Sequence, residues 1–165
     1  MAIWFKTHLR RISVRTKTIQ HVTQSILEQA GQPTAQLSLS LVGKTRMRRL
    51  NRTYRGRDYP TDVLAFPMKN MGVQTEVFLG DVVICMPVAI GQAARFGNTP
   101  DQEILRLLIH GILHLLGYDH EHSQQEAARM QRKERAVSKK FLRILGFSPK
   151  VKNRAHDPSS FFQIL

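Results

Sequence analysis

The segment from Thr99 to Gly117 constrains the fold most, because it should form a helix that is buried on nearly every side. Thr99 and Gln102 can form a capping box around a proline at the first helical position, and Gly117 can end the helix. Residues 104–116 are apolar apart from Arg106, two histidines and a glycine. Because a helix that is apolar all round lies inside a domain, and this run is too short to cross a membrane, we predict a central helix.

The histidines of this helix and of the residues after it form the second constraint. His110 and His114 are four residues apart, so both side chains project from one face of the helix. Gly117 lets the chain turn back, which can bring His120 to the same point. Three imidazoles fill three positions of a tetrahedral zinc ion and leave the fourth for water or substrate. His122 is an alternative third ligand, and any single histidine could instead be an ordinary hydrogen-bonded residue.

The spacing of these histidines equals that of the metzincin peptidases, H-E-x-x-H-x-x-G-x-x-H. The chain has Gly111 at the position where those enzymes place their general-base glutamate. Asp81, Asp119 or Glu121 would have to replace it, so the pattern disfavours peptide hydrolysis. RNA cleavage is compatible with a glycine there, because a metal can polarise a phosphoryl oxygen and the 2′-OH can serve as an internal nucleophile.

Charge is distributed in three blocks along the chain. Residues 1–57 contain twelve Lys and Arg against one acid, for a net charge of +11. Residues 58–128, which hold the histidines, have a net charge of −6, and residues 129–165 a net charge of +8. Basic segments on either side of an acidic centre suit a polyanion such as RNA, since Lys and Arg displace the counterions of phosphates. The alternative is a basic surface without a specific partner.

Several side chains outside the histidine segment could contribute to a site. Arg55 precedes Gly56 near the end of a predicted helix and could hold a phosphate with two hydrogen bonds, or it could be one surface arginine among many. Asp62, Asp81 and Asp119 could orient the histidine rings, although Asp62 and Asp81 could equally serve as turn or cap residues. Further RNA-binding candidates are Arg46, Arg48, Arg49, Arg52 and Arg57.

The order of the predicted elements indicates an α+β fold. Alternating or short apolar runs predict strands at residues 3–9, 12–14, 37–42, 63–66 and 76–84, with a possible bulge at Gly80. Helical periodicity predicts helices at residues 19–30, 45–55, 87–96, 100–116 and 123–145, the second capped by Thr45 with Met47, Leu50 and Tyr54 on one face. We expect a single catalytic domain over residues 1–146, a mixed β-sheet with packed helices, and a basic, flexible tail over residues 147–165.

Cysteine content and the N-terminus bear on the compartment. Cys85 is the only cysteine, so the chain can form no internal disulfide, and its apolar strand context predicts a core residue rather than a nucleophile. The N-terminus has no secretory signal pattern, so we expect a cytoplasmic protein. The first 27 residues lack acids, which leaves an organellar matrix as the alternative.

Four segments together resemble the YbeY family of metal-dependent endoribonucleases and ribosomal RNA maturation factors. They are His110–His120, Leu50–Gly56, Thr61–Pro67 and Leu79–Ile84, they occur in the family's order, and the resemblance covers roughly residues 37–145. It implies a mixed sheet with packed helices and one zinc ion per chain at His110, His114 and His120. Arg55 matches the family's important arginine, whereas Ala65 stands where the family usually has serine.

The resemblance also implies the activity and the partners. These are single-strand-specific cleavage of RNA, 16S rRNA 3′-end maturation, ribosome quality control, and contact with the ribosome or its small subunit but with no membrane. We therefore predict a zinc-dependent endoribonuclease in which His114 and Arg55 are catalytic. The alternatives are a non-catalytic, zinc-stabilised ribosome-assembly or RNA-binding factor and a metallopeptidase.

Overall fold

The computed structural model describes residues 3–7, 9, 12–14, 16–68, 77–118, 123–144 and 162–164. Its strands are β1 (Ile3–Thr7), β2 (Ile12–Val14), β3 (Gln36–Val42), β4 (Val63–Pro67), β5 (Phe78–Cys85) and β6 (Phe162–Ile164). Its helices are α1 (Thr16–Gln29), α2 (Lys44–Arg55), α3 (Met86–Phe96), α4 (Pro100–Leu115) and α5 (Gln124–Ile144). The alternating and periodic segments of the sequence therefore form the predicted strands and helices.

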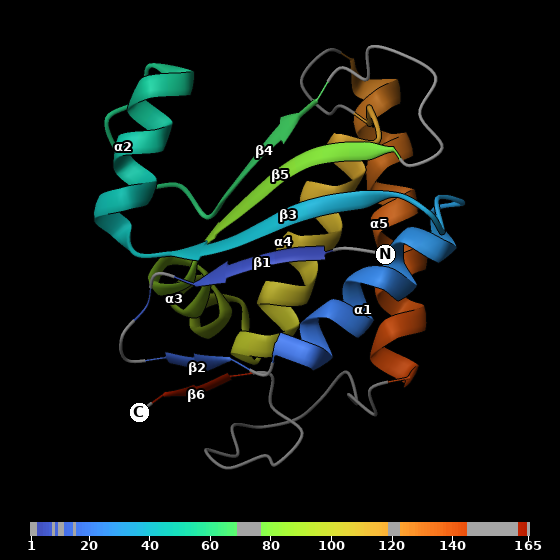
Figure 1. Cartoon of the computed structure of the whole chain (residues 1–165), viewed down its shortest axis with the longest axis horizontal. Coiled ribbons are helices and arrows are strands. Elements are labelled where there is room, and N and C mark those ends of the chain that lie inside the picture. Colours follow the sequence, from blue (N-terminus) through green and yellow to red (C-terminus); the bar gives the residue numbers. More distant parts are fainter. Residues whose placement is uncertain are drawn as a thin grey trace.

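The main sheet is mixed, as predicted. Its strand order is β1-β3-β5-β4, with β1, β3 and β5 parallel and β4 antiparallel to β5 (Figure 1). A separate antiparallel pair joins β2 to β6, with Ser13 opposite Gln163. Strand β6 falls within residues 147–165, which we expected to be a flexible tail, so at least its three residues have a partner strand. The rest of that segment lies outside the described residues.

The bulge predicted at Gly80 is present in β5. Gln36 of β3 pairs with Phe78, but Ser38 pairs with Asp81, so β5 has one extra residue between these two pairs. Gly80 has a φ of +133°, and a Cβ atom there would collide with the carbonyl oxygen of Phe66 on β4. Only glycine both adopts this φ readily and leaves room for the carbonyl oxygen.

Helices cover the two faces of the main sheet unequally. Helices α1 and α4 pack on one face, with α5 packed on α4, whereas α2 lies on the other face near one end (Figure 1). Helix α4 is central: most of its side chains are buried, including Leu107, Ile109 and Ile112, and they pack against residues such as Leu39 and Val82 of the sheet. This confirms the prediction of a buried central helix. Among the described residues, no helix is both long and apolar enough to span a membrane.

The start of α4 is held by the predicted capping box. The backbone N–H of Gln102 donates to Thr99 Oγ1 at 3.3 Å, and the N–H of Thr99 donates to Gln102 Oε1 at 2.9 Å. At the start of α5, the N–H of Glu126 donates to Ser123 Oγ at 3.1 Å. Side chains therefore satisfy N–H groups that have no partner within these helices.

A smaller core under α2 corrects two expectations. Buried Met47 packs with Val83 and Cys85 of the sheet. The N-cap of α2 is Gly43, with no side-chain hydrogen bond, so the prediction of Thr45 as the cap is wrong because the helix already begins at Lys44. Tyr54 does not share the buried face of Met47: its side chain is 63% exposed and meets the Phe66 ring edge-on at 5.0 Å.

Candidate active site

A pocket of about 550 Å³ lies where α4 faces β4 and the end of α2. Helix α4 contributes His110, His114 and Arg106 to its wall. The end of α2 and the residue after its terminal glycine contribute Arg55 and Arg57. The pocket therefore combines two of the predicted metal ligands with the arginine predicted to bind phosphate, although the two segments are about fifty residues apart in the sequence.

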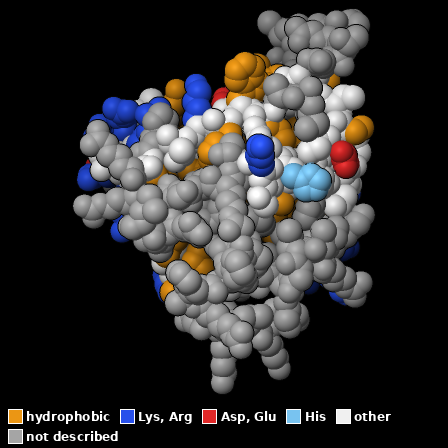
Figure 2. Space-filling model, turned by 60° about the horizontal axis from the view of Figure 1, so that its bottom comes forward, with side chains coloured by type: hydrophobic (Ala, Val, Ile, Leu, Met, Phe, Trp, Pro, Cys, Tyr) orange, Lys and Arg blue, Asp and Glu red, His pale blue; other side chains and the backbone are white. Residues whose placement is uncertain are grey.

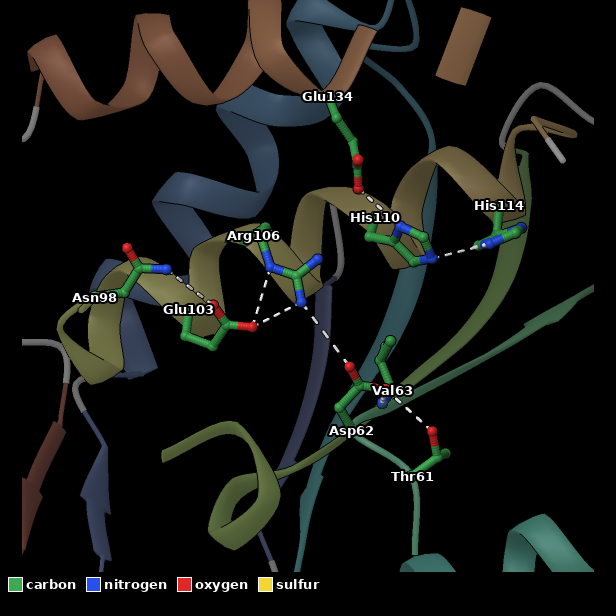
Figure 3. Close-up of polar contacts among 9 residues, drawn as sticks. All are labelled: Thr61, Asp62, Val63, Asn98, Glu103, Arg106, His110, His114 and Glu134. Atoms are coloured by element: carbon green, nitrogen blue, oxygen red, sulfur yellow. Dashed lines mark hydrogen bonds and ion pairs between the residues drawn. The ribbon is translucent and has the colours of Figure 1, made fainter. Parts of the chain in front are cut away.

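The two histidines of α4 converge as their spacing predicts. Nε2 of His110 lies 3.1 Å from Nε2 of His114, and the ring centroids are 4.6 Å apart at an angle of 72° (Figure 3). Both residues are partly exposed, and both line the pocket.

Glu134 of α5 fixes the ring of His110. Its Oε1 lies 2.7 Å from His110 Nδ1, and the two side chains are only 19% and 22% exposed (Figure 3). A carboxylate only accepts hydrogen bonds, so Nδ1–H is the donor. In the neutral ring, a proton on Nδ1 makes Nε2 the nitrogen with a lone pair, which is the arrangement found for metal-binding histidines.

The two histidines fit a zinc ion. Nitrogen ligands of a tetrahedral zinc ion lie about 2.0–2.1 Å from the metal, which puts two of them about 3.3 Å from each other. The distance of 3.1 Å between the Nε2 atoms is close to that value. His120, the expected third ligand, and the nearby Asp119 and His122 lie outside the described residues. Within the described part of the chain, no group of three His, Cys, Asp or Glu side chains is arranged to hold a metal ion.

The close packing of α4 on the sheet explains why residue 111 is a glycine, which the sequence did not reveal. A Cβ atom at this position would lie 2.7 Å from Cγ1 and 3.2 Å from Cγ2 of Val82, which is fully buried in β5. Position 111 therefore faces the sheet at a close approach of helix and strand. A glutamate there would meet Val82 first, so this packing offers no room for the general base of a zinc peptidase.

Arg55 and Arg57 are held at the mouth of the pocket by the turn that ends α2. Gly56 adopts the left-handed conformation, with φ +67°, which reverses the chain between the two arginines. Buried Asn51 donates from Nδ2 to the carbonyl oxygen of Tyr59 at 2.8 Å, and the N–H of Arg57 donates to the carbonyl oxygen of Asn51 at 3.3 Å. The loop that carries Arg57 is thus fastened to the helix that carries Arg55.

The remaining RNA-binding candidates divide into two groups. Arg48 forms a bidentate pair with Asp58, at 3.0 and 2.7 Å, and Arg52 lies 3.8 Å from the same carboxylate. The hydrogen bond between Arg48 and Asp58 raises the pKa of Arg48 and lowers that of Asp58. Arg46 and Arg49 are exposed on α2. Basic side chains gather at the end of the molecule where α2 lies (left in Figure 2).

Of the remaining predicted site residues, the structure describes Asp62, Asp81 and Cys85, whereas Asp119 lies outside the described residues. Asp62 lines the pocket, but its Oδ1 accepts from the N–H of Val63 at 2.8 Å, which suits the turn role considered for it. Asp81 alternates with Val82 along β5, so it belongs to the face of the sheet opposite α4. Cys85 is fully buried, and burial raises the pKa of its thiol, which confirms a core residue.

Sequence reasoning missed two partners of the site. Glu134 lies between Met130 and Val137, at the helical spacing of the buried stripe of α5, so an acid on an apolar face was the signal that could have identified it. Arg106 precedes His110 by one helical turn and pairs with fully buried Glu103, at 3.0 Å from Nε and 2.7 Å from Nη2 (Figure 3). In the sequence, Arg106 stands out only as an interruption of the apolar run.

Comparison with known proteins identifies the family to which the chain is similar. The family model for endoribonuclease YbeY matches residues 5–142. A protein named endoribonuclease YbeY from a Sulfurihydrogenibium species is 42% identical over 117 residues, which are 71% of this chain and 77% of the relative. One of the same name from Aquifex aeolicus is 38% identical over 137 residues, 83% of this chain and 91% of the relative.

A solved structure supports the same relationship. The solution structure of a protein from Thermotoga maritima superposes with a TM-score of 0.64 at 27% identity, covering 90% of this chain and 94% of that one. The family model spans most of the chain and includes α2, the sheet, α4 and most of α5. The chain therefore belongs to the YbeY family of endoribonucleases.

Proposed function

We propose that the chain is a zinc-dependent endoribonuclease specific for single strands, which acts in 16S rRNA 3′-end maturation and ribosome quality control in the cytoplasm. The observation that carries the proposal is the pocket that places His110 and His114 opposite Arg55. The YbeY relatives are named endoribonucleases, which supports RNA as the substrate. The basic end of the molecule at α2 is suited to the phosphates of RNA and of the small ribosomal subunit (Figure 2).

His110 and His114, with His120 as the third ligand, would hold one zinc ion per chain. When bound, zinc supplies Lewis acidity that polarises a phosphoryl oxygen. Glu134 keeps the proton on His110 Nδ1, so that Nε2 remains a donor of its lone pair. The partly buried Glu134–His110 pair also holds the ring in one orientation, which lowers the cost of organising the site when substrate enters.

Arg55 would bind the scissile phosphate and stabilise the charge that develops on it. Its guanidinium is exposed at the pocket and its helix ends at Gly56, so two N–H groups can reach one phosphate. The carboxylate general base of the zinc peptidases is replaced by Gly111, so an RNA substrate, which brings its own 2′-OH, suits the pocket better than a peptide.

Two variants separate the metal ligand from the phosphate-binding residue. We expect His114→Ala to lose zinc and RNA cleavage together, whereas Arg55→Ala should keep zinc and lose cleavage by roughly 100-fold or more, the usual effect of removing a group that stabilises transition-state charge. Arg95→Ala removes the same charge from an exposed position on α3 outside the pocket and should cleave nearly as fast as the wild type.

Zinc content and cleavage of a labelled single-stranded RNA would be measured on the same preparations. Metal-dependent cleavage by a folded His114→Ala protein would contradict the proposal. Tight RNA binding by the wild type without any cleavage, at about one bound zinc per chain, would instead identify a non-catalytic ribosome-assembly factor.

A further inference from the structure

Arg106 forms part of the pocket wall but has no role in the mechanism above. It lies at i−4 from His110 and i−8 from His114, so the three side chains follow one line along α4 (Figure 3). Arg55 and Arg57 reach the pocket from the end of α2. Positive side chains therefore line the pocket from two different elements.

The guanidinium of Arg106 is held in one orientation by an acid beneath it. Glu103 is fully buried, and its Oε1 accepts from Nε at 3.0 Å and from Nη2 at 2.7 Å. Its Oε2 accepts from Nδ2 of Asn98 at 3.3 Å, and Oδ2 of Asp62 lies 3.9 Å from Nη2 of Arg106 (Figure 3). Both carboxyl groups contact the Nε and Nη2 side of the guanidinium.

The opposite side of the guanidinium is open to a ligand. The Arg106 side chain is 43% exposed, and within the described part of the chain no side chain accepts from Nη1. Burial acts to lower the pKa of Arg106. The hydrogen bond to Glu103 and the charges of Glu103, Asp62 and Glu134 outweigh this effect and raise the pKa above its usual value, so the group stays charged at any physiological pH. A permanently charged, oriented donor on a pocket wall suits an anion.

We infer that Arg106 is a second phosphate-binding residue, which holds an RNA phosphodiester next to the one positioned at the histidines. One helical turn separates Arg106 from His110, so its guanidinium lies beside the point where the Nε2 atoms converge and not at that point. Arg106 is thus a residue that positions the strand. This inference rests on the proposed function, because it takes RNA as the ligand.

Neutral phosphates can test this contact in the full-length, zinc-loaded protein. A fluorescein-labelled single-stranded RNA of about 12 nucleotides lies within the span that single-strand-binding surfaces cover. Versions that each carry one methylphosphonate lose a single negative charge. We expect the version modified at the phosphate held by Arg106 to bind the wild type about tenfold more weakly, as for a lost charge-assisted hydrogen bond. Arg106→Gln should bind the unmodified RNA at that weakened level and should not respond to this modification, while it still responds to a methylphosphonate at the phosphate held by Arg55.

Salt dependence provides a second readout. The slope of log K against log salt should be smaller by about 0.7 in Arg106→Gln, the effect of one lost phosphate contact on a single strand. Arg95→Gln is the matched control, since it removes an exposed arginine from α3 outside the pocket, and its affinity and slope should stay close to those of the wild type.

A further variant separates binding from folding. Arg106→Gln leaves Glu103 buried without its cation, so the variant should melt at a lower temperature than the wild type. Glu103→Gln/Arg106→Gln also removes the buried charge and should recover part of that loss while RNA binding stays weak. If affinity recovers together with stability, Arg106 only neutralises Glu103 and the inference is wrong.

The inference and the proposed function fail in different ways. A wild-type protein that binds and cleaves RNA, with an Arg106→Gln variant equal to it in affinity and in methylphosphonate response, would overturn only the role of Arg106. A wild-type protein that neither binds nor cleaves single-stranded RNA would overturn the proposed function itself.

Discussion

Gly111 shows at the scale of one residue why this pocket differs from that of a zinc peptidase. Its Cα approaches Val82 so closely that no side chain fits without movement of the valine, and β-branched valine has few alternative rotamers. The same position carries the catalytic glutamate in metzincins. A residue small enough to pack against the sheet at position 111 therefore cannot carry the carboxylate that peptidase chemistry requires.

The first prediction concerns this contact. Gly111→Ala should lower the free energy of unfolding by about 1–3 kcal/mol, the usual cost of overpacking a core, even though alanine favours helix. Gly91→Ala in α3 is the control: apart from its chain neighbours and the backbone of its own helix, nothing lies within 4 Å of the place that its added methyl group would take, so it should gain up to about 1 kcal/mol. Urea unfolding of both variants measures the difference, and equal stabilisation of the two would contradict the packing argument.

Glu134 leads to the second prediction at this scale. Glu134→Ala should weaken zinc binding by about 10- to 100-fold, because the ring of His110 loses the acceptor that fixes its proton and orientation. Glu134→Gln keeps an acceptor oxygen, so zinc binding should weaken less than in Glu134→Ala. Glu126→Ala removes an exposed acid from the same helix and serves as the control. Zinc affinities from chelator competition that are equal in all three variants would disprove this role.

The sequence revealed only part of the site at residue scale. Local spacing was enough to bring His110 and His114 together, because four residues make about one helical turn. Glu134 lies 24 residues from His110, and its contact depends on how α5 packs on α4, which no spacing rule supplies. Arg106 was visible but ambiguous, since only the structure shows that Glu103 beneath it is fully buried.

At the scale of elements, α4 presents the histidines and its capping box fixes where it begins. Thr99→Ala removes the oxygen that accepts from the N–H of Gln102 and should cost about 1 kcal/mol of stability. Thr99→Ser keeps the oxygen and should stay close to the wild type. Thermal unfolding compares the two, and an alanine variant as stable as the serine variant would contradict the role of the cap.

Elements were predictable where periodicity and capping agreed. Strong apolar patterns placed α4 and β3 correctly, because burial on one or both sides leaves a clear pattern. The bulge at Gly80 was predicted from a glycine inside a strand pattern. Thr45 was wrongly assigned as a cap because a polar residue suited to an N-cap also fits the first turn of a helix. Strand β6 was missed because the polar, basic and proline-containing composition of residues 147–165 indicated a flexible tail.

At the scale of the whole molecule, the fold joins two chemically different regions. Helix α2, which carries the arginines, lies on one face of the sheet near its end, whereas α4, which carries the histidines, lies on the other face (Figure 1). The pocket lies between them: Arg55 at the end of α2 and Arg57 just after it line the pocket together with Val63, where β4 begins. Residues of both regions therefore line one pocket.

Cleavage by purified protein of known zinc content tests the proposed nuclease most directly. The substrates are a labelled single-stranded RNA, its duplex and casein, and His114→Ala is assayed in parallel. We expect cleavage of the single strand alone, lost together with zinc in the variant. Cleavage of casein, or RNA cleavage that persists in a folded His114→Ala protein without zinc, would contradict a zinc-dependent, single-strand-specific endoribonuclease.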